Sequence, residues 1–247
     1  MTAQMVTPRI DWPVWTRFAL TGHDLDIAVR RLGGDKALDR WRHSLRHRIL
    51  TGTSFPPLDR PKRWDEANVV ELLTFADGNI SMLDCGAYNS PAPWAASRLG
   101  VRNVAGIDLN PRLPMSPHSH HIDYSCQNMM ATAYHDASFD AIVSGSVVEH
   151  GVDWRAWLGE CRRLIRPGGL LYVSTDVVHE EIDTSGLAAF GLPWNPLRPS
   201  EIAGMKDLFA EAGFEAAETP TPVLPDDLPV EFLDVEIGFV GFAVRVA

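Results

Sequence analysis

Two carboxylates at the ends of apolar runs are the first residues whose type and spacing could do chemistry. Asp84 follows ISML and opens the stretch DCGAYNSP, and Asp108 follows NVAGI, 22 residues beyond Gly86. A carboxylate at this spacing after a glycine-containing turn can accept both ribose hydroxyls of an adenosine-type ligand. The dinucleotide fingerprint G-x-G-x-x-G is absent, because no glycine follows Gly86 before Gly100. A ligand without a pyrophosphate therefore fits this loop better.

Two histidines are candidates for proton transfer. His150 and His179 each come shortly after an apolar run. A neutral imidazole near pH 7 is the usual group that accepts a proton from a hydroxyl or an amine. For His150, a metal site shared with Glu149 and a purely structural role stay open as alternatives.

The chain shows no convincing metal site. His118, His120 and His121 lie close together, but no clear pattern of acidic or cysteine partners accompanies them, which favours a surface loop. Three cysteines, odd in number and far apart, form neither a disulfide framework nor a zinc pattern. We expect a protein without a bound metal, in a reducing cytoplasm.

The hydrophobic pattern from residue 79 onward indicates the scaffold that positions these side chains. Short apolar runs alternate with amphipathic stretches, which predicts parallel strands joined by helices. The expected strands are 80–84, 103–109, 120–124, 138–146, 170–176, 214–219 and 235–246. The expected helices are 64–77, 93–100, 155–165 and 200–213. Right-handed crossovers make such a sheet doubly wound, and ligands bind beyond the carboxyl ends of its strands.

Charge divides the 247-residue chain into two parts. Residues 1–63 carry 12 Lys/Arg against 6 Asp/Glu, whereas residues 64–247 carry 10 against 26. The front section (1–63) is expected to form a helical cap outside the sheet, joined to a cofactor-binding domain (64–247). Its arginines 40, 42, 46 and 48 form either a solvated helix face or an electropositive wall near an anionic ligand. The net charge of -10 argues against broad nucleic-acid binding.

The sequence also limits the association with membranes. The first 17 residues contain no apolar run of signal-peptide length, and no stretch of about 18 apolar residues occurs anywhere. We expect no membrane partner and a cytoplasmic location. The oligomeric state stays open, with a homodimer as one option.

Four motifs occur together in a characteristic order: DCGAYNSP, GIDLNPR, SFDAIVSGSVVEH and RRLIRPGGLLYVSTD. Through them the chain resembles the class I S-adenosylmethionine (SAM)-dependent methyltransferases, especially the type 11 group that acts on small molecules. The resemblance covers residues 78–176 strongly and 200–246 more loosely. It implies an α/β, Rossmann-like, doubly wound sheet of seven strands, mostly parallel with an antiparallel last strand. It also implies SAM as the cofactor and S-adenosylhomocysteine (SAH) as its product.

The resemblance implies roles for individual residues of the cofactor site. Asp84 would orient the methionine amino group, and Gly86 would let the backbone lie against the methionine moiety. Asp108 would bind the ribose hydroxyls, and Leu109 would pack on the adenine. Asn128 stands where the family often has an Asp that meets the adenine amino group. The other residues expected at this site are Ala87, Tyr88, Met129, Ser144 and Ser146. The loop departs from the family pattern D-x-G-x-G-x-G, because Tyr88 occupies the second glycine position.

Residues 177–198 correspond to a region that commonly helps to form the acceptor pocket in this family. Phe190 and Trp194 are expected to form an aromatic wall there, with Glu149 as a further substrate-binding residue. The alternative is a lid that these rings merely anchor to the core. The leading function is methyl transfer to a hydroxyl or amine of a small specialised metabolite or saccharide. Methylation of RNA or protein, and a non-catalytic SAM-binding or partner-binding module, are the alternatives.

Overall fold

The computed structural model describes residues 10–32, 45, 49, 60–76, 78–116 and 122–247. Its described residues form a nine-stranded sheet in the order β1-β11-β6-β5-β2-β3-β4, with β9 and β10 also paired to β11. The strands are β1 (Trp15–Ala19), β2 (Ser81–Cys85), β3 (Asn103–Asp108), β4 (Ile122–Cys126), β5 (Phe139–Gly145), β6 (Ile165–Val177), β9 (Phe214–Glu215), β10 (Val230–Phe232) and β11 (Val235–Val246).

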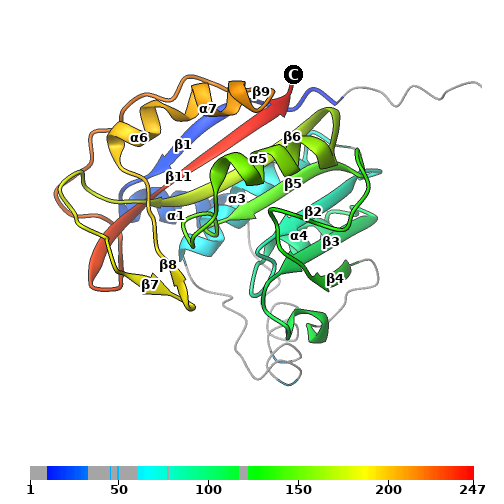
Figure 1. The fold of residues 1–247 in the computed structure, drawn as a ribbon, viewed down its shortest axis with the longest axis horizontal. Coiled ribbons are helices and arrows are strands. Elements are labelled where there is room, and N and C mark those ends of the chain that lie inside the picture. Colours follow the sequence, from blue (N-terminus) through cyan, green and yellow to red (C-terminus); the bar gives the residue numbers. More distant parts are fainter. Residues whose placement is uncertain (1–9, 33–44, 46–48, 50–59, 77, 117–121) are drawn as a thin grey trace, which may run out of the picture.

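The strand directions confirm the expected fold class. The pairs β2–β3, β3–β4, β2–β5 and β5–β6 are parallel, whereas β11 runs antiparallel to β6. All seven strands expected from the sequence are present within a few residues, although β9 is only two residues long. Two strands of this sheet, β1 and β10, were not expected, so it has nine strands rather than seven. Figure 1 shows β1 beside β11.

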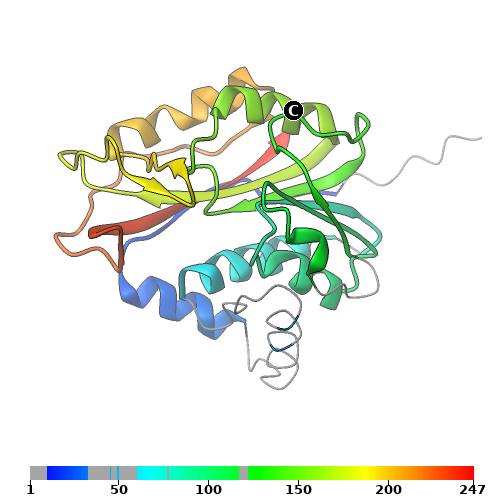
Figure 2. The ribbon, with the colours of Figure 1, turned by 60° about the horizontal axis from the view of Figure 1, so that its bottom comes forward.

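Helices cover both faces of the sheet. Figure 2 shows α1 (Gly22–Arg31), α3 (Arg60–Leu73) and α4 (Ala92–Arg98) on one face. The opposite face carries α5 (Trp154–Leu164), α6 (Pro199–Ala203) and α7 (Met205–Glu211). A short 3-10 helix, η1 (Leu113–Met115), lies between β3 and β4. The doubly wound arrangement follows from this two-sided covering.

Helix α5 illustrates how the sequence specifies these elements. Asp153 caps its first turn, because the side chain accepts hydrogen bonds from the backbone N–H groups of Arg155 and Ala156. Its buried residues recur at helical spacing and form one apolar stripe: Trp157, Leu158, Cys161 and Leu164. The predicted helix at 200–213 is instead two helices, α6 and α7, which meet at Gly204.

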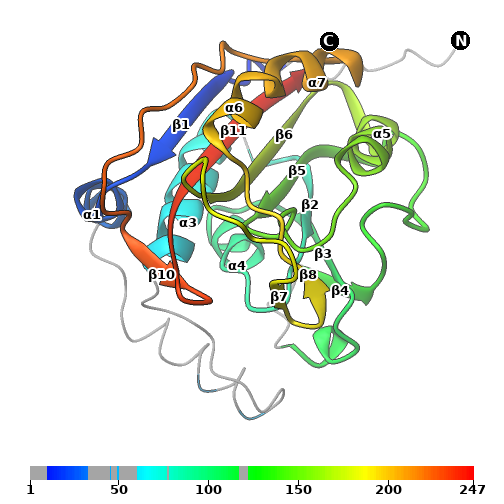
Figure 3. The ribbon, with the colours of Figure 1, turned by 60° about the vertical axis from the view of Figure 1, so that its left-hand side comes forward.

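The front section does not lie wholly outside the sheet. Strand β1 pairs antiparallel with residues 239–243 of β11, whose other edge pairs with β6. Figure 3 shows β1 beside β11. Trp12, just before β1, is buried in a core cluster with Leu72 and Tyr172. The expectation of a purely external cap is therefore wrong for this segment, because a five-residue strand gives too short an alternation to stand out in the sequence.

The remaining boundaries stay predictions. Helix α3 runs through the proposed boundary at residue 63 without a break. The insertion at 177–198 contains a small hairpin of β7 (Ala188–Ala189) and β8 (Leu192–Pro193). Several residues weighed above lie outside the described part of the chain: Arg40, Arg42, Arg46, Arg48, His118, His120 and His121.

Candidate functional site

The carboxyl ends of β2, β3, β5 and β6 meet at one edge of the sheet, because these strands are parallel neighbours. This edge brings together Asp84 at the end of β2, Asp108 at the end of β3 and Asp176 near the end of β6. The loop after β5 adds Ser146, Glu149 and His150. Ligands of doubly wound sheets bind at this edge.

Asp84 is buried, and one of its carboxylate oxygens could accept a hydrogen bond from a cationic group of a ligand. The residue is 1% exposed, and its Oδ2 has no hydrogen-bond partner among the described residues. Burial raises the pKa of this carboxyl to about 7, although the hydroxyl of Ser90 and the charge of Lys62 act in the opposite direction. A buried acceptor without a partner is costly, so this oxygen fits the amino group of a bound methionine moiety.

The loop after β2 is tied to β3. The backbone N–H groups of Gly86 and Ala87 both donate to the carbonyl of Ile107, at 2.8 and 2.9 Å. Gly86 has φ +84°, and a Cβ at this position would lie 2.2 Å from Cγ2 of Val147. Only glycine tolerates both conditions. Ala87 is buried, and the N–H of Tyr88 donates to Oδ2 of Asp108 at 3.1 Å. The carboxylates of Asp84 and Asp108 are thereby held in one rigid unit.

Asp108 keeps acceptor capacity for a ligand. Its Oδ1 accepts from the N–H of Asn110 at 2.8 Å and its Oδ2 accepts from Tyr88, so each oxygen retains a second lone pair. The next side chain, Leu109, is 57% exposed. An exposed leucine beside a half-buried carboxylate suits the adenine and ribose of one nucleoside.

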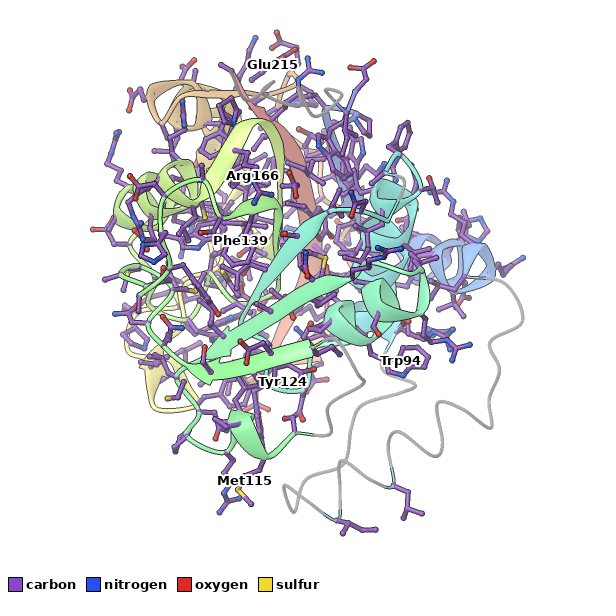
Figure 4. The ribbon with its side chains drawn as sticks, turned by 90° about the vertical axis from the view of Figure 1, so that its right-hand side faces the viewer. Trp94, Met115, Tyr124, Phe139, Arg166 and Glu215 are labelled. Atoms are coloured by element: carbon purple, nitrogen blue, oxygen red, sulfur yellow. The ribbon has the colours of Figure 1, made fainter. Side chains whose placement is uncertain are left out.

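The other residues expected near the adenine follow β4, the strand beside β3. Asn128 follows β4 and is exposed, but its Oδ1 already accepts from the N–H of Met130 at 2.9 Å. Met129 is half-buried and packs on the main core. Tyr124 on β4 lies against Gly106 of β3, where a Cβ would come within 2.7 Å of its ring (Figure 4). Close packing of β3 on β4 thus fixes this side of the site.

Two serines at the end of β5 act within the protein framework. Ser144 is fully buried, and its hydroxyl donates to the carbonyl of Cys85 at 3.0 Å, which leaves no exposed surface of Ser144 for a cofactor. Ser146 has φ +53°, and its hydroxyl donates to Asp65 at 3.2 Å. Asp65 also accepts from Tyr172 and Ser174, at 3.0 and 2.5 Å.

Lys62 contributes a positive charge at this edge of the sheet, and the sequence analysis did not identify it as a site residue. Its Nζ donates to the carbonyl of Gly145 at 2.8 Å. Its charge opposes the rise in pKa that burial causes at four acids around the edge: Asp65, Asp84, Glu149 and Asp176. No sequence signal marks Lys62, because only the tertiary packing of α3 brings it to the sheet.

A buried acid pair lies behind the loop after β5. Glu149 is 1% exposed and accepts from the hydroxyl of Thr175 at 3.1 Å, and burial beside Asp176 raises its pKa. Asp176 is 4% exposed and accepts from Nε1 of Trp194 at 2.9 Å, and burial raises its pKa to about 6. Glu149 is thus withdrawn from direct substrate contact. Asp176 closes an apolar strand as Asp84 and Asp108 do, so the same sequence signal could have identified it.

The two predicted aromatic residues take different positions. Trp194 is fully buried and anchors the segment to Asp176, which corresponds to the structural alternative rather than to a pocket wall. Phe190 is 86% exposed, and its ring centroid lies 5.2 Å from that of His150. Phe232 of β10, which the sequence did not single out, lies 6.4 Å from His150.

His150 is at the site, in a desolvated position. Its side chain is 14% exposed, and its Nε2 lies 3.8 Å from Oε1 of Glu149. Burial and the charge of Lys62 lower the pKa of His150 to about 4, so the imidazole is neutral at pH 7. Its Nδ1 has no hydrogen-bond partner among the described residues. The second candidate, His179, also has one ring nitrogen, Nε2, that is buried without such a partner.

Within the described part of the chain, no three His, Cys, Asp or Glu side chains gather in a group that could hold a metal ion. The same residues contain no helix with the length and hydropathy of a membrane span.

Comparisons with known proteins point to one family. Residues 83–173 match the family model described as a methyltransferase domain. The ubiquinone biosynthesis O-methyltransferase of Cereibacter sphaeroides (strain ATCC 17029 / ATH 2.4.9) is 32% identical over 121 residues, which are 47% of this chain and 48% of the relative. The chain thus spans about half the length of the curated relatives it matches.

Two solved structures share the fold. One is the 1,6-didemethyltoxoflavin-N1-methyltransferase of Burkholderia thailandensis, with bound 1,6-didemethyltoxoflavin and SAH (TM-score 0.56, 17% identity, 85% of this chain and 88% of that one). The other is the geranyl diphosphate C-methyltransferase of Streptomyces coelicolor, in complex with Mg²⁺, geranyl diphosphate and SAH (TM-score 0.56, 15% identity, 92% and 98%). Family model, curated relatives and fold agree with the motifs of the sequence. The chain is therefore similar to the class I SAM-dependent methyltransferases, through a methyltransferase domain at residues 83–173.

Proposed function

We propose that this protein transfers the methyl group of SAM to a hydroxyl or amine of a small molecule, such as a specialised metabolite or a saccharide. The observation that supports this most is the pair Asp84 and Asp108 at adjacent strand ends. One carboxyl is buried with an unpartnered oxygen, and the other is half-buried beside exposed Leu109. Together they match an amino acid moiety and a nucleoside in one ligand.

SAM supplies a methyl group that its positive sulfur already activates for in-line displacement. The contributions left to the protein are alignment of the two reactants, exclusion of water and removal of the acceptor's proton. Asp84 and Asp108 would hold the amino group and the ribose of the cofactor, and the Gly86–Ala87 turn is tied to β3 through the carbonyl of Ile107. The loop after β5 then presents His150 to the same edge.

His150 is the proposed proton acceptor. It is neutral at pH 7 because its pKa is low, and its Nδ1 is buried without a hydrogen-bond partner among the described residues. Oε1 of Glu149 lies 3.8 Å from Nε2, close enough to attract the imidazolium when the carboxyl is ionised. His179 is the second candidate for this task.

The net charge of -10 weighs against a nucleic-acid substrate, because an acidic protein repels a phosphate backbone. A non-catalytic module would not need a buried histidine whose Nδ1 has no hydrogen-bond partner among the described residues, so we favour an enzyme.

Replacement of His150 by Ala tests this mechanism. Turnover, measured as SAH formation with an acceptor identified from a panel of hydroxyl and amine compounds, should fall by about 10²–10⁴-fold. The affinity for SAH should stay unchanged, because His150 is not assigned a cofactor contact. His135→Ala is the matched control, since His135 is exposed and precedes β5, whereas His150 follows the opposite end of that strand. Wild-type turnover in His150→Ala would exclude this residue as the proton acceptor.

A further inference from the structure

Phe190 occupies a backbone position that disfavours it. Strands β7 and β8 pair through Ala189 and Leu192, so Phe190 and Gly191 form the two-residue turn. Both have positive φ, +55° and +80°. A turn of this kind favours Asn-Gly, and a bulky side chain there is strained. Such strain persists where the surrounding structure or a function maintains it.

The folded chain gains little burial from this aromatic ring. Phe190 is 86% exposed, whereas Trp194 in the same segment is fully buried and hydrogen-bonded to Asp176. Trp194 therefore anchors the hairpin to the core. What Phe190 does contact is His150, in an edge-to-face arrangement with an angle of 82° between the rings.

A second aromatic residue approaches the same imidazole from another element. Phe232 of β10 lies 6.4 Å from His150 and 5.4 Å from Trp194. The acids beneath, Glu149 and Asp176, are 1% and 4% exposed, so they do not form the outer surface here. Two hydrocarbon rings, one from the strained hairpin and one from β10, thus lie near His150.

From this arrangement, and resting on the function proposed above, we propose that Phe190 is a specificity-determining residue that stacks on a planar, apolar acceptor beside His150. Ring pairs gain more in offset or edge-to-face contact than their buried area alone provides. A planar acceptor would cover the exposed ring and hold its hydroxyl or amine near His150. An acceptor without a planar apolar face gains less from this ring, so of the two acceptor classes named above a planar metabolite is favoured over a saccharide.

The test compares two ligands of matched size, 2-naphthol and decahydro-2-naphthol, which carry one hydroxyl each but differ in planarity. Dissociation constants are measured by NMR titration on the SAH-loaded protein. We expect 2-naphthol to bind at least tenfold more tightly than its saturated counterpart. Phe190→Asn should remove this preference, while Phe190→Tyr should keep it. Phe75→Asn is the matched control, because Phe75 is 51% exposed and lies between α3 and β2 at the opposite edge of the sheet.

Folding and cofactor binding are measured separately, through the melting temperature and the affinity for SAH. Asn suits the left-handed turn, so Phe190→Asn should melt at or above the wild-type temperature and bind SAH unchanged. Equal affinity of the wild type for both ligands, failure to bind either, or an unchanged preference in Phe190→Asn would overturn the inference while SAH still binds. Loss of SAH binding by the wild type would instead refute the proposed function itself.

Discussion

Asp84 and Asp108 both end parallel strands, but their environments give them different properties. Asp84 is buried with a raised pKa, whereas Asp108 is half-buried and accepts two backbone N–H groups. Their positions could be predicted from the sequence, because a carboxylate after an apolar strand must lie at the carboxyl edge. The burial of Ser144 and Trp194 could not, since it depends on which neighbours tertiary packing brings to each side chain.

The raised pKa of Asp84 predicts a pH dependence of cofactor binding. A positively charged amino group binds the ionised carboxyl, which predominates only above about pH 7. The affinity for SAH should therefore fall as the pH is lowered from 8 to 5.5, by about tenfold per unit well below the pKa. Asp84→Asn should weaken binding at pH 8 and lose this dependence. Calorimetry at several pH values measures both.

The same group affects stability with a definite sign. Between about pH 4 and 7 the folded protein holds a proton on Asp84 that the unfolded chain has released, so this carboxyl makes stability fall as the pH rises. Asp123→Asn is the control, because Asp123 is an exposed residue of β4. It should change neither the pH dependence of SAH binding nor the pH dependence of stability. A binding profile that Asp84→Asn leaves intact would remove Asp84 from the cofactor site.

The loop after β2 requires a glycine at position 86 for a reason that depends on its contact with another loop. Its glycine was expected to let the backbone approach a ligand, but the structure adds a second reason, the side chain of Val147 in the loop after β5. This contact between two loops is invisible in the sequence. The strands themselves were largely predictable, since β2, β3, β5 and β6 are apolar runs bounded by polar turns. β1, β7 and β8 could not be predicted in this way, because they are too short to show a clear hydrophobic pattern.

Gly86→Ala should lower the free energy of unfolding by about 2–5 kcal/mol, through left-handed strain and overpacking against Val147. Gly186→Ala is the matched control, because Gly186 has φ +82° with nothing within 4 Å of an added Cβ. It should cost only the backbone strain, about 1–2 kcal/mol. Denaturant unfolding measures both values, and equal losses would show that the contact with Val147 is unimportant.

The whole molecule joins its basic front section to its acidic body more closely than the charge pattern suggested. β1 lies in the sheet, and Arg17 on this strand pairs with Glu71 of α3 at 2.5 Å. Part of the positive charge of the front section (1–63) is therefore neutralised by an ion pair with the acidic domain (64–247). Composition could reveal the asymmetry of charge but not its location, because charge counts carry no information on pairing.

Substitution of the buried Trp12 tests whether the front section is part of the folded core. Trp12→Ala should lower the free energy of unfolding by about 3–5 kcal/mol, as expected for a large buried aromatic side chain. Phe75→Ala, at a half-exposed ring, should cost much less. Thermal and denaturant unfolding compare the two. If Trp12→Ala were as stable as the wild type, residues 10–19 would be a dispensable appendage.

Calorimetric titration with SAH tests whether the edge formed by Asp84 and Asp108 holds SAM. We predict that the wild type binds SAH with a micromolar or lower dissociation constant. Asp108→Ala should bind it at least tenfold more weakly, because both ribose hydroxyls lose their acceptor. A wild-type protein that binds neither SAM nor SAH at micromolar concentration, or an Asp108→Ala variant with undiminished affinity, would contradict the account.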